Sequence, residues 1–369
     1  MRYLRSLPVE KILIDRFLDL GKKIPVLDVR SPGEYKHAHI PGAYNLPLFT
    51  DEERKIVGTA YKQQSREAAI KIGLDYFGPK MRVMVEYVES LTGSGPRQVL
   101  VHCWRGGMRS AGVAWLLDLY GYKVCTLAGG YKSYRNRVIN TFSFPFSFNI
   151  LGGYTGSGKT YVLEELANKG AAAIDLEKIA HHKGSAFGDI GMPDQPTQEM
   201  FENILSHELR TFIKNDHDAS AGMSSPIWLE DESQRIGRIN LPNDLWNTMR
   251  QSPVFFMNIP FEKRLKHILH EYGFLDKEKM ANGILRIQKR LGPMETKSAL
   301  QYLEAGDIES CFRILLTYYD KQYNKALNNR EELKSLLTRL DCDTVNAKIN
   351  ADKITAKELF IYSSAWKKV

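Results

Sequence analysis

The glycine-rich stretch at residues 153–160 (GYTGSGKT) constrains the fold more than any other part of this 369-residue chain. It fits the pattern G-x-x-x-x-G-K-[ST], follows an apolar run at residues 148–151 and precedes an amphipathic stretch at 161–169. Between a strand and a helix, such glycines let backbone N–H groups wrap a phosphate, while the lysine reaches its outer oxygens and the hydroxyl can hold Mg²⁺. We therefore predict an α/β unit that binds a phosphate or diphosphate through Gly153, Gly156, Ser157, Gly158, Lys159 and Thr160.

Three further apolar runs extend this predicted sheet, at residues 172–175, 227–230 and 254–258. The second run ends in three consecutive acids, Glu230, Asp231 and Glu232. A carboxylate at a strand end beside a phosphate loop can support magnesium, although a solvated strand end explains the same acids equally well. Arg235 follows and is expected either to cover a phosphate or to lie on the surface.

A polar stretch between these strands is a candidate substrate loop. It begins with His181, His182 and Lys183 and continues as GSAFG at residues 184–188. Neighbouring side chains diverge on regular structure, so the adjacent histidines make a poor metal pair and we predict no metal site.

The first third of the chain has its own α/β pattern. Buried strands are predicted at residues 24–29, 99–103 and 124–127, with a helix at 110–119, which favours a mainly parallel sheet. The stretch FSFPFSF, with Pro145 at its centre, marks a boundary. We therefore predict an α/β domain at residues 1–140, the phosphate-loop domain at 146–260 and a mainly helical, basic region at 261–369.

A cysteine lies in the loop HCWRGGMRS, between a predicted strand and a predicted helix. Gly106 and Gly107 free successive backbone N–H groups to curl around the Cys103 sulfur, and Arg105 and Arg109 add positive charge. All of these groups favour thiolate over thiol, so we expect a reactive cysteine beside a bound anion. The alternative is that Cys103 is a small buried core residue.

Composition and charge narrow the function classes. Net charge is +9 over residues 1–145, −6 over 146–260 and +5 over 261–369, so the two ends are expected to meet a polyanion, although basicity can also serve solubility alone. The C-terminal region offers several candidate nucleic-acid contacts, Lys263, Arg264, Lys266, Arg286, Lys289 and Arg290. No spanning segment or signal peptide is predicted, and the four scattered cysteines predict neither disulfides nor zinc, which favours the cytoplasm.

The segment at residues 28–47 (DVRSPGEYKHAHIPGAYNLP) closely resembles the signature near the start of rhodanese domains, and LAGG at 127–130 resembles their last strand and turn. The resemblance covers residues 1–140. Common sulfurtransferase rhodaneses have a cysteine loop that is one residue shorter. The longer loop, with Arg109 six positions after Cys103, resembles the phosphatase-like branch. This resemblance implies that the loop binds a tetrahedral, phosphate-like anion.

With HCWRGGMRS, GGYTGSGKT, KGSAFG and EDESQRIG in this order, the chain resembles the tRNA 2-selenouridine synthases. The resemblance implies S-geranylation of the wobble 2-thiouridine of the tRNAs for Lys, Glu and Gln with geranyl diphosphate. Exchange of the S-geranyl group for selenium from selenophosphate then follows, with Cys103 expected to carry selenium as a Cys–S–Se adduct. We further expect a monomer that binds the anticodon arm of the tRNA and holds no cofactor tightly. The alternative is a phosphatase-like or sulfurtransferase enzyme whose P-loop regulates it.

Overall fold

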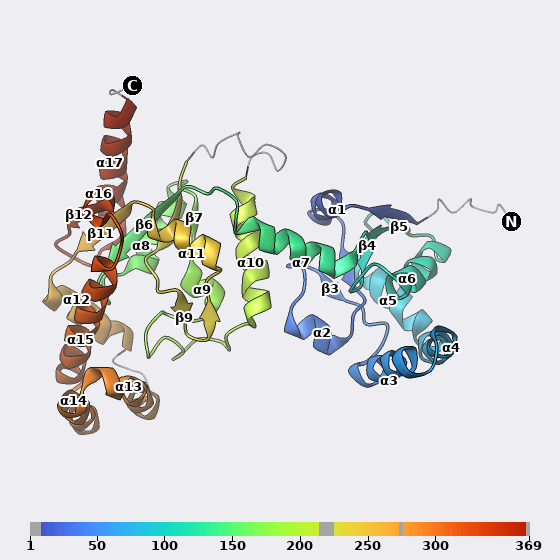
Figure 1. The fold of residues 1–369 in the computed structure, drawn as a ribbon, viewed down its shortest axis with the longest axis horizontal. Helices are drawn as coiled ribbons and strands as arrows, with labels where there is room; N and C mark the ends of the chain where they lie inside the picture. Colours follow the sequence, from blue (N-terminus) through green and yellow to red (C-terminus); the bar gives the residue numbers. More distant parts are fainter. Residues whose placement is uncertain (1–8, 214–224, 273–275, 367–369) are drawn as a thin grey trace. The chain divides into compact units, whose positions relative to one another are not determined.

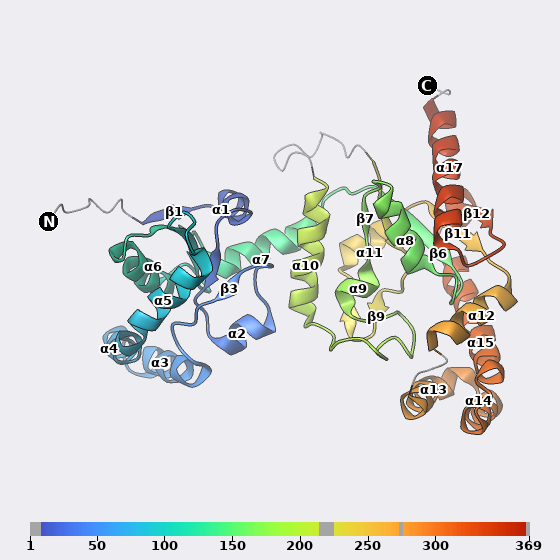
Figure 2. The ribbon, with the colours of Figure 1, turned by 180° about the vertical axis from the view of Figure 1, so that it is seen from behind.

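A computed structural model describes residues 9–213, 225–272 and 276–366 (Figures 1 and 2). The chain forms two compact units. One contains residues 1–141 together with Glu202–His207, and the other contains Phe142–Phe201 and Glu208–Val369. Within the described part of the chain, no helix combines the length and the apolar character needed to cross a membrane.

The first unit is built on a five-stranded parallel sheet in the order β1-β5-β4-β2-β3. Its strands are β1 (Glu10–Ile12), β2 (Val26–Asp28), β3 (Tyr44–Asn45), β4 (Gln98–His102) and β5 (Lys123–Leu127). Its helices are α1 (Ile14–Gly21), α2 (Pro32–His37), α3 (Asp51–Gln63), α4 (Arg66–Phe77), α5 (Met81–Thr92), α6 (Met108–Leu119) and α7 (Gly130–Thr141), with a short 3₁₀ helix at Gly78–Lys80. The predicted strands and helix are confirmed. Their apolar runs are continuous because helices cover both faces of a parallel sheet.

The second unit has a parallel sheet in the order β12-β11-β6-β8-β7 and a separate antiparallel pair, β9 with β10. Its strands are β6 (Phe148–Gly153), β7 (Ala173–Ile174), β8 (Ile227–Glu230), β9 (Arg235–Ile236), β10 (Ile239–Asn240), β11 (Val254–Asn258) and β12 (Leu337–Asp341). Its helices are α8 (Lys159–Asn168), α9 (Leu176–Ala180), α10 (Gln198–Thr211), α11 (Asn243–Arg250), α12 (Phe261–Tyr272), α13 (Lys277–Leu291), α14 (Pro293–Ala305), α15 (Ile308–Asn328), α16 (Leu333–Leu336) and α17 (Ala347–Trp366). Residues 202–207 of α10 group with the first unit.

The region from residue 261 onward is mainly helical, as predicted, but it does not form a third unit. β12 pairs in parallel with β11, with Leu337 opposite Val254, and α17 packs on α8 (Figure 1). The helices α12 to α15 enclose a second hydrophobic cluster beside the one on the sheet. The phosphate-loop domain therefore extends to the end of the described chain, because its sheet takes its edge strand from residues 337–341.

Candidate functional site

Cys103 lies directly after β4, at the entrance to α6, and its side chain is buried. Its Sγ atom accepts a hydrogen bond from the Gly107 N–H at 3.4 Å and lies 3.3 Å from the Ser110 hydroxyl. Burial opposes ionisation of this thiol. The hydrogen bonds from Ser110 and Gly107 and the charge of Arg109 outweigh it, so the pKa of Cys103 falls below its ordinary value.

Glycine is required where the cysteine loop meets the turn after β5. Gly106 has φ +65°, and a Cβ there would lie 2.5 Å from the carbonyl oxygen of Leu127. Gly130 has φ +60°, and its Cβ would lie 2.4 Å from the carbonyl oxygen of Cys103. The Tyr131 N–H donates to that same Cys103 oxygen at 2.8 Å. The two loops are therefore packed backbone against backbone, and any side chain at either glycine would separate them.

The two arginines of the loop have different surroundings. Arg109 forms an ion pair with Glu34 at 2.8 Å, and burial of Glu34 is outweighed by this arginine, so the pKa of the carboxyl is lowered. Arg105 is exposed, and no ion pair joins it to another of the described residues. Arg105 can therefore turn toward an incoming anion, while Arg109 acts on the thiol from a fixed position.

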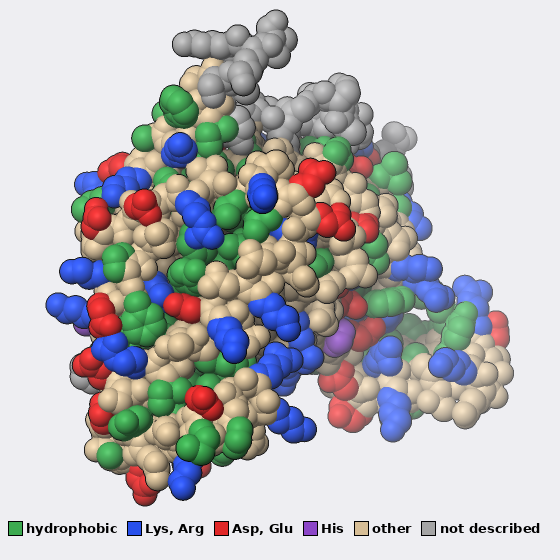
Figure 3. Space-filling model, turned by 60° about the vertical axis from the view of Figure 1, so that its left-hand side comes forward, with side chains coloured by type: hydrophobic (Ala, Val, Ile, Leu, Met, Phe, Trp, Pro, Cys, Tyr) green, Lys and Arg blue, Asp and Glu red, His purple; other side chains and the backbone are tan. Residues whose placement is uncertain are grey.

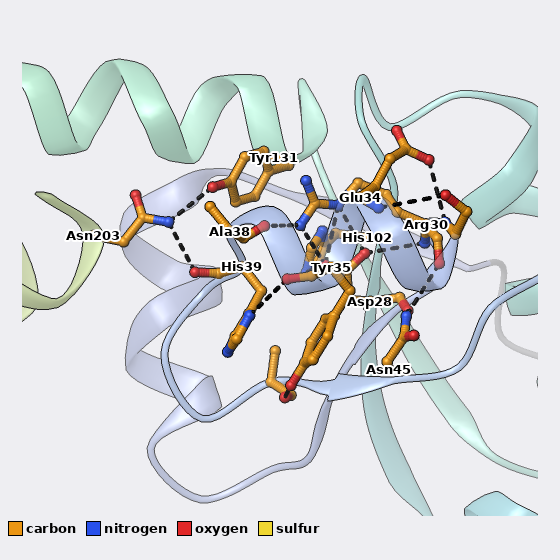
Figure 4. A network of polar contacts seen from close by, with 12 residues as sticks. Asp28, Arg30, Glu34, Tyr35, Ala38, His39, Asn45, His102, Tyr131 and Asn203 are labelled. Carbon is orange, nitrogen blue, oxygen red and sulfur yellow. Dashed lines mark hydrogen bonds and ion pairs between the residues drawn. The ribbon is translucent and has the colours of Figure 1, made fainter. Parts of the chain in front are cut away.

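A buried polar network supports this loop (Figure 4). Arg30 donates to Asp28 Oδ2 at 2.6 Å and to the Ala38 carbonyl at 2.7 Å, and its guanidinium lies 3.7 Å from the centre of the Tyr131 ring. Both members of this ion pair are almost completely buried. Asp28 and Arg30 are therefore a scaffold, since each satisfies the buried charge of the other. His102 is also fully buried, and its Nε2 lies 3.8 Å from Asp28 Oδ2. Neither ring nitrogen has a hydrogen-bond partner among the described residues.

We expect Cys103 to ionise at lower pH than the other cysteines. Burial raises the pKa of Cys311 to about 11 and also raises those of Cys125 and Cys342. The measurement is ultraviolet absorbance of thiolate across a pH series, taken as wild type minus Cys103→Ser. Ser110→Ala should move this difference titration to higher pH, because it removes a donor to the thiolate. An unchanged curve in Ser110→Ala would contradict the assigned cause.

The phosphate loop connects β6 to α8, as predicted. Gly156 and Gly158 have φ +81° and +72°, and the Lys159 ammonium donates to the Gly153 carbonyl at 3.1 Å. The hydroxyl of Ser157 is buried, and no hydrogen bond joins it to any residue in the part of the chain that the structure describes. The loop forms one wall of a cavity of about 750 Å³ that lies wholly within the second unit. All of the predicted loop residues from Gly156 to Thr160 line this cavity, and Gly153 lies at the end of β6.

Two carboxylates face the phosphate loop. Glu177 accepts a hydrogen bond from the Thr160 hydroxyl at 3.0 Å, and Glu232 lines the same cavity. A Cβ on Gly184 would lie 2.5 Å from Glu232 and 3.0 Å from Glu177, so both acids converge there. Burial raises the pKa of each carboxyl, and the charge of Glu177 raises that of Glu232 further. Mg²⁺ is usually held by one or two carboxylates plus phosphate oxygens, so Thr160 and Glu177 are the residues that would hold it beside a bound diphosphate.

The structure separates the remaining predicted residues. Glu230 is completely buried and accepts from the Leu176 N–H at 3.1 Å, so it does not reach the cavity. Asp231 lines the cavity, but Tyr323, at 2.5 Å, and Arg330 already bind its carboxylate. Arg235 is exposed and donates to the Gly237 carbonyl at 2.9 Å, away from the cavity lining. Of the three acids at the end of β8, Glu232 thus lines the cavity beside Glu177 and forms no ion pair with another of the described residues.

Sequence reasoning missed the apolar wall of this cavity. One face of α15 supplies Phe312, Leu315, Leu316 and Tyr319, and the predicted substrate loop supplies Phe187. Their spacing on α15 is the ordinary pattern of an amphipathic helix, which does not by itself distinguish a ligand wall from a core. The cavity therefore joins a phosphate-binding end to an apolar end.

One predicted nucleic-acid contact is wrong. Arg264 is buried, pairs with Asp320 at 2.6 Å and donates to the Thr155 carbonyl of the phosphate loop at 3.0 Å. It holds this loop rather than facing solvent. Lys263 and Lys266 on the same helix are exposed. Figure 3 shows basic side chains gathering near the middle of one face, with acidic ones interspersed around them.

The comparisons with known proteins match both units. The family model for the tRNA 2-selenouridine synthase AAA domain matches residues 146–354, and a rhodanese-like domain matches 13–137. Among the relatives named tRNA 2-selenouridine synthase, that of Bdellovibrio bacteriovorus is 35% identical over 84% of this chain and 90% of its own. Those of Serratia proteamaculans and Aeromonas salmonicida are 34% and 32% identical, over 84% and 89% of this chain and 88% and 93% of theirs. The chain therefore belongs to the tRNA 2-selenouridine synthase family.

Proposed function

We propose that this protein modifies tRNA in the cytoplasm as a monomer, converting wobble 2-thiouridine to 2-selenouridine in two steps. The first step attaches a geranyl group from geranyl diphosphate to sulfur, and the second replaces the S-geranyl group with selenium from selenophosphate. The observation that carries the proposal is the cavity of the second unit, where a phosphate loop and an apolar wall face the same space. A diphosphate joined to a short hydrocarbon chain matches both ends.

In the first step, the thiocarbonyl sulfur attacks C1 of geranyl diphosphate. The C1–O bond breaks, its electron pair leaves with the diphosphate, and the nucleobase gives up its N3 proton. Lys159 and the loop N–H groups stabilise the charge that develops on the leaving diphosphate. Magnesium, when bound, would neutralise further charge on the same group. Alkylation is chemically useful because sulfur then departs as a thiol in the second step.

In the second step, the Cys103 thiolate attacks the phosphorus of selenophosphate, and selenium leaves with the bonding pair as hydroselenide. Hydroselenide attacks C2 of the S-geranyl nucleoside, its proton passes to N3, and geranyl thiolate departs. Water then releases phosphate from the phosphocysteine. This step replaces the Cys–S–Se adduct expected above. Release of selenium from that adduct as hydroselenide would need an added reductant.

The decisive experiment is mass spectrometry of nucleosides from thiolated tRNA incubated with the protein. Geranyl diphosphate alone should yield S-geranyl-2-thiouridine, and the addition of selenophosphate should yield 2-selenouridine. Turnover of an aryl phosphate with no change in the tRNA would instead favour the phosphatase-like alternative. Unchanged tRNA with sulfur transfer from thiosulfate would favour a sulfurtransferase.

We expect the affinity for tRNA to fall steeply with salt. Each neutralised phosphate contributes roughly −0.7 to −0.9 to the slope of log K against log salt concentration. Lys263→Ala/Lys266→Ala should weaken binding and flatten this slope by about 1.5, because both side chains are exposed on α12. The measurement is a fluorescence titration across a salt series, with Glu164→Gln on α8 as the control. An unchanged slope in the double variant would move the tRNA contact away from α12.

A further inference from the structure

The apolar end of the cavity has a defined floor. Phe187, from the loop after α9, meets Phe312 on α15, with ring centroids 6.3 Å apart. It also meets Tyr319, about two helical turns further along α15, with ring centroids 6.5 Å apart. Both phenylalanines line the cavity and belong to the cluster enclosed by α12 to α15. Phe187, Phe312, Leu315 and Leu316 give this end of the cavity an apolar surface, which suits a hydrocarbon.

The length of the cavity can be judged from residue positions along α15. The Tyr323 hydroxyl lies 3.3 Å from the Gly153 N–H, which places this residue at the phosphate loop. Phe312 lies eleven positions earlier on the same helix, about 16 Å away at 1.5 Å per residue. The wall between them gives room for a diphosphate followed by a short prenyl chain.

The Phe187 ring packs against α13 on the side away from the cavity. A Cβ on Gly283, in α13, would lie only 2.5 Å from Cδ1 and Cε1 of this ring. The neighbouring Ala186 N–H donates to the Tyr319 hydroxyl at 3.1 Å, which ties the loop to α15. The ring is therefore held between α13 and α15, and the absence of a side chain at Gly283 sets how far it retreats from the cavity.

We propose that Phe187, seated against Gly283 and opposite Phe312, determines the length of the prenyl chain that the cavity accepts. This inference rests on the proposed function and deepens it. Geranyl fits above the ring, while farnesyl, one isoprene unit longer, needs the space that the ring occupies. Hydrophobic pockets discriminate single methylene groups by roughly 10- to 200-fold, so the loss or displacement of one ring is enough to change the preference.

Two substitutions should shift the preference in opposite directions. Phe187→Ala opens the floor and should raise the ratio of farnesyl to geranyl transfer by about 10-fold or more. Gly283→Ala, which also suits a helix, should push the ring into the cavity and favour dimethylallyl over geranyl. Phe187→Leu should give a smaller shift toward farnesyl while keeping most of the packing.

The test is a competition among equimolar dimethylallyl, geranyl and farnesyl diphosphates on a thiolated anticodon stem-loop, read by mass spectrometry of the product nucleosides. Leu303→Ala is the matched control, because Leu303 is buried in the same cluster but does not line the cavity. It should lower the melting temperature without changing the product ratio. Unchanged ratios in both Phe187→Leu and Gly283→Ala would overturn the inference, even if Phe187→Ala fails to fold. If the wild type transfers no prenyl group at all, the proposed function fails instead.

Discussion

A Cys103→Ser protein is expected to make S-geranyl-2-thiouridine at the normal rate and no 2-selenouridine. The thiol is the group that the loop prepares, since the Gly107 N–H donates to its sulfur, the Ser110 hydroxyl lies 3.3 Å from it and Arg109 adds charge. Serine keeps the size of the side chain, but its hydroxyl stays protonated and cannot attack selenophosphate. The measurement is the time course of both nucleosides in tRNA incubated with geranyl diphosphate and selenophosphate.

The control for this experiment is Cys125→Ser. Cys125 lies on β5 of the same unit and is also buried, but burial and Glu10 raise its pKa, so it lacks the features of a nucleophile. This variant should still form 2-selenouridine. Intact-mass analysis of the wild type with selenophosphate alone should reveal a phosphoryl adduct on Cys103. Normal 2-selenouridine formation by Cys103→Ser would exclude covalent catalysis by this residue.

The cysteine loop and the phosphate loop could be located from the sequence because each is a local feature. Glycines at fixed spacing between an apolar run and a helical pattern predict the backbone path, and φ values of +65° at Gly106 and +81° at Gly156 agree with it. The strands were equally clear, since each central strand is a short apolar run. Such signals depend on neighbours in the chain, not on distant partners.

Features that depend on distant partners were missed. Arg264 has the sequence environment of a solvated helix residue, and its burial follows from Asp320, which lies on α15. The strand β12 (LTRLD) mixes three polar residues with two leucines at the sheet edge, so it carries none of the continuous apolar signal of β11. The apolar wall likewise exists only because Phe187 folds back onto α15.

A Lys159→Ala protein is expected to lose geranyl transfer by about 10²- to 10³-fold, the usual cost of removing one group that stabilises charge in a transition state. Lys159 begins α8, and its ammonium donates to the Gly153 carbonyl, so it lies where a diphosphate would displace that bond. Alanine is a strong helix former, so the unit should still fold. The measurement is S-geranyl-2-thiouridine formed at saturating geranyl diphosphate, without ATP.

Lys169→Ala provides the matched control, because Lys169 directly follows α8 and pairs with Asp352 at the surface. It should transfer geranyl normally. Supplying RNA that already carries S-geranyl-2-thiouridine should restore 2-selenouridine formation to Lys159→Ala, whereas Cys103→Ser should stay inactive on the same RNA. This pair of outcomes assigns one step to each unit. Full geranyl transfer by a folded Lys159→Ala protein would remove the phosphate loop from the reaction, and a strict need for ATP would make it a nucleotide site.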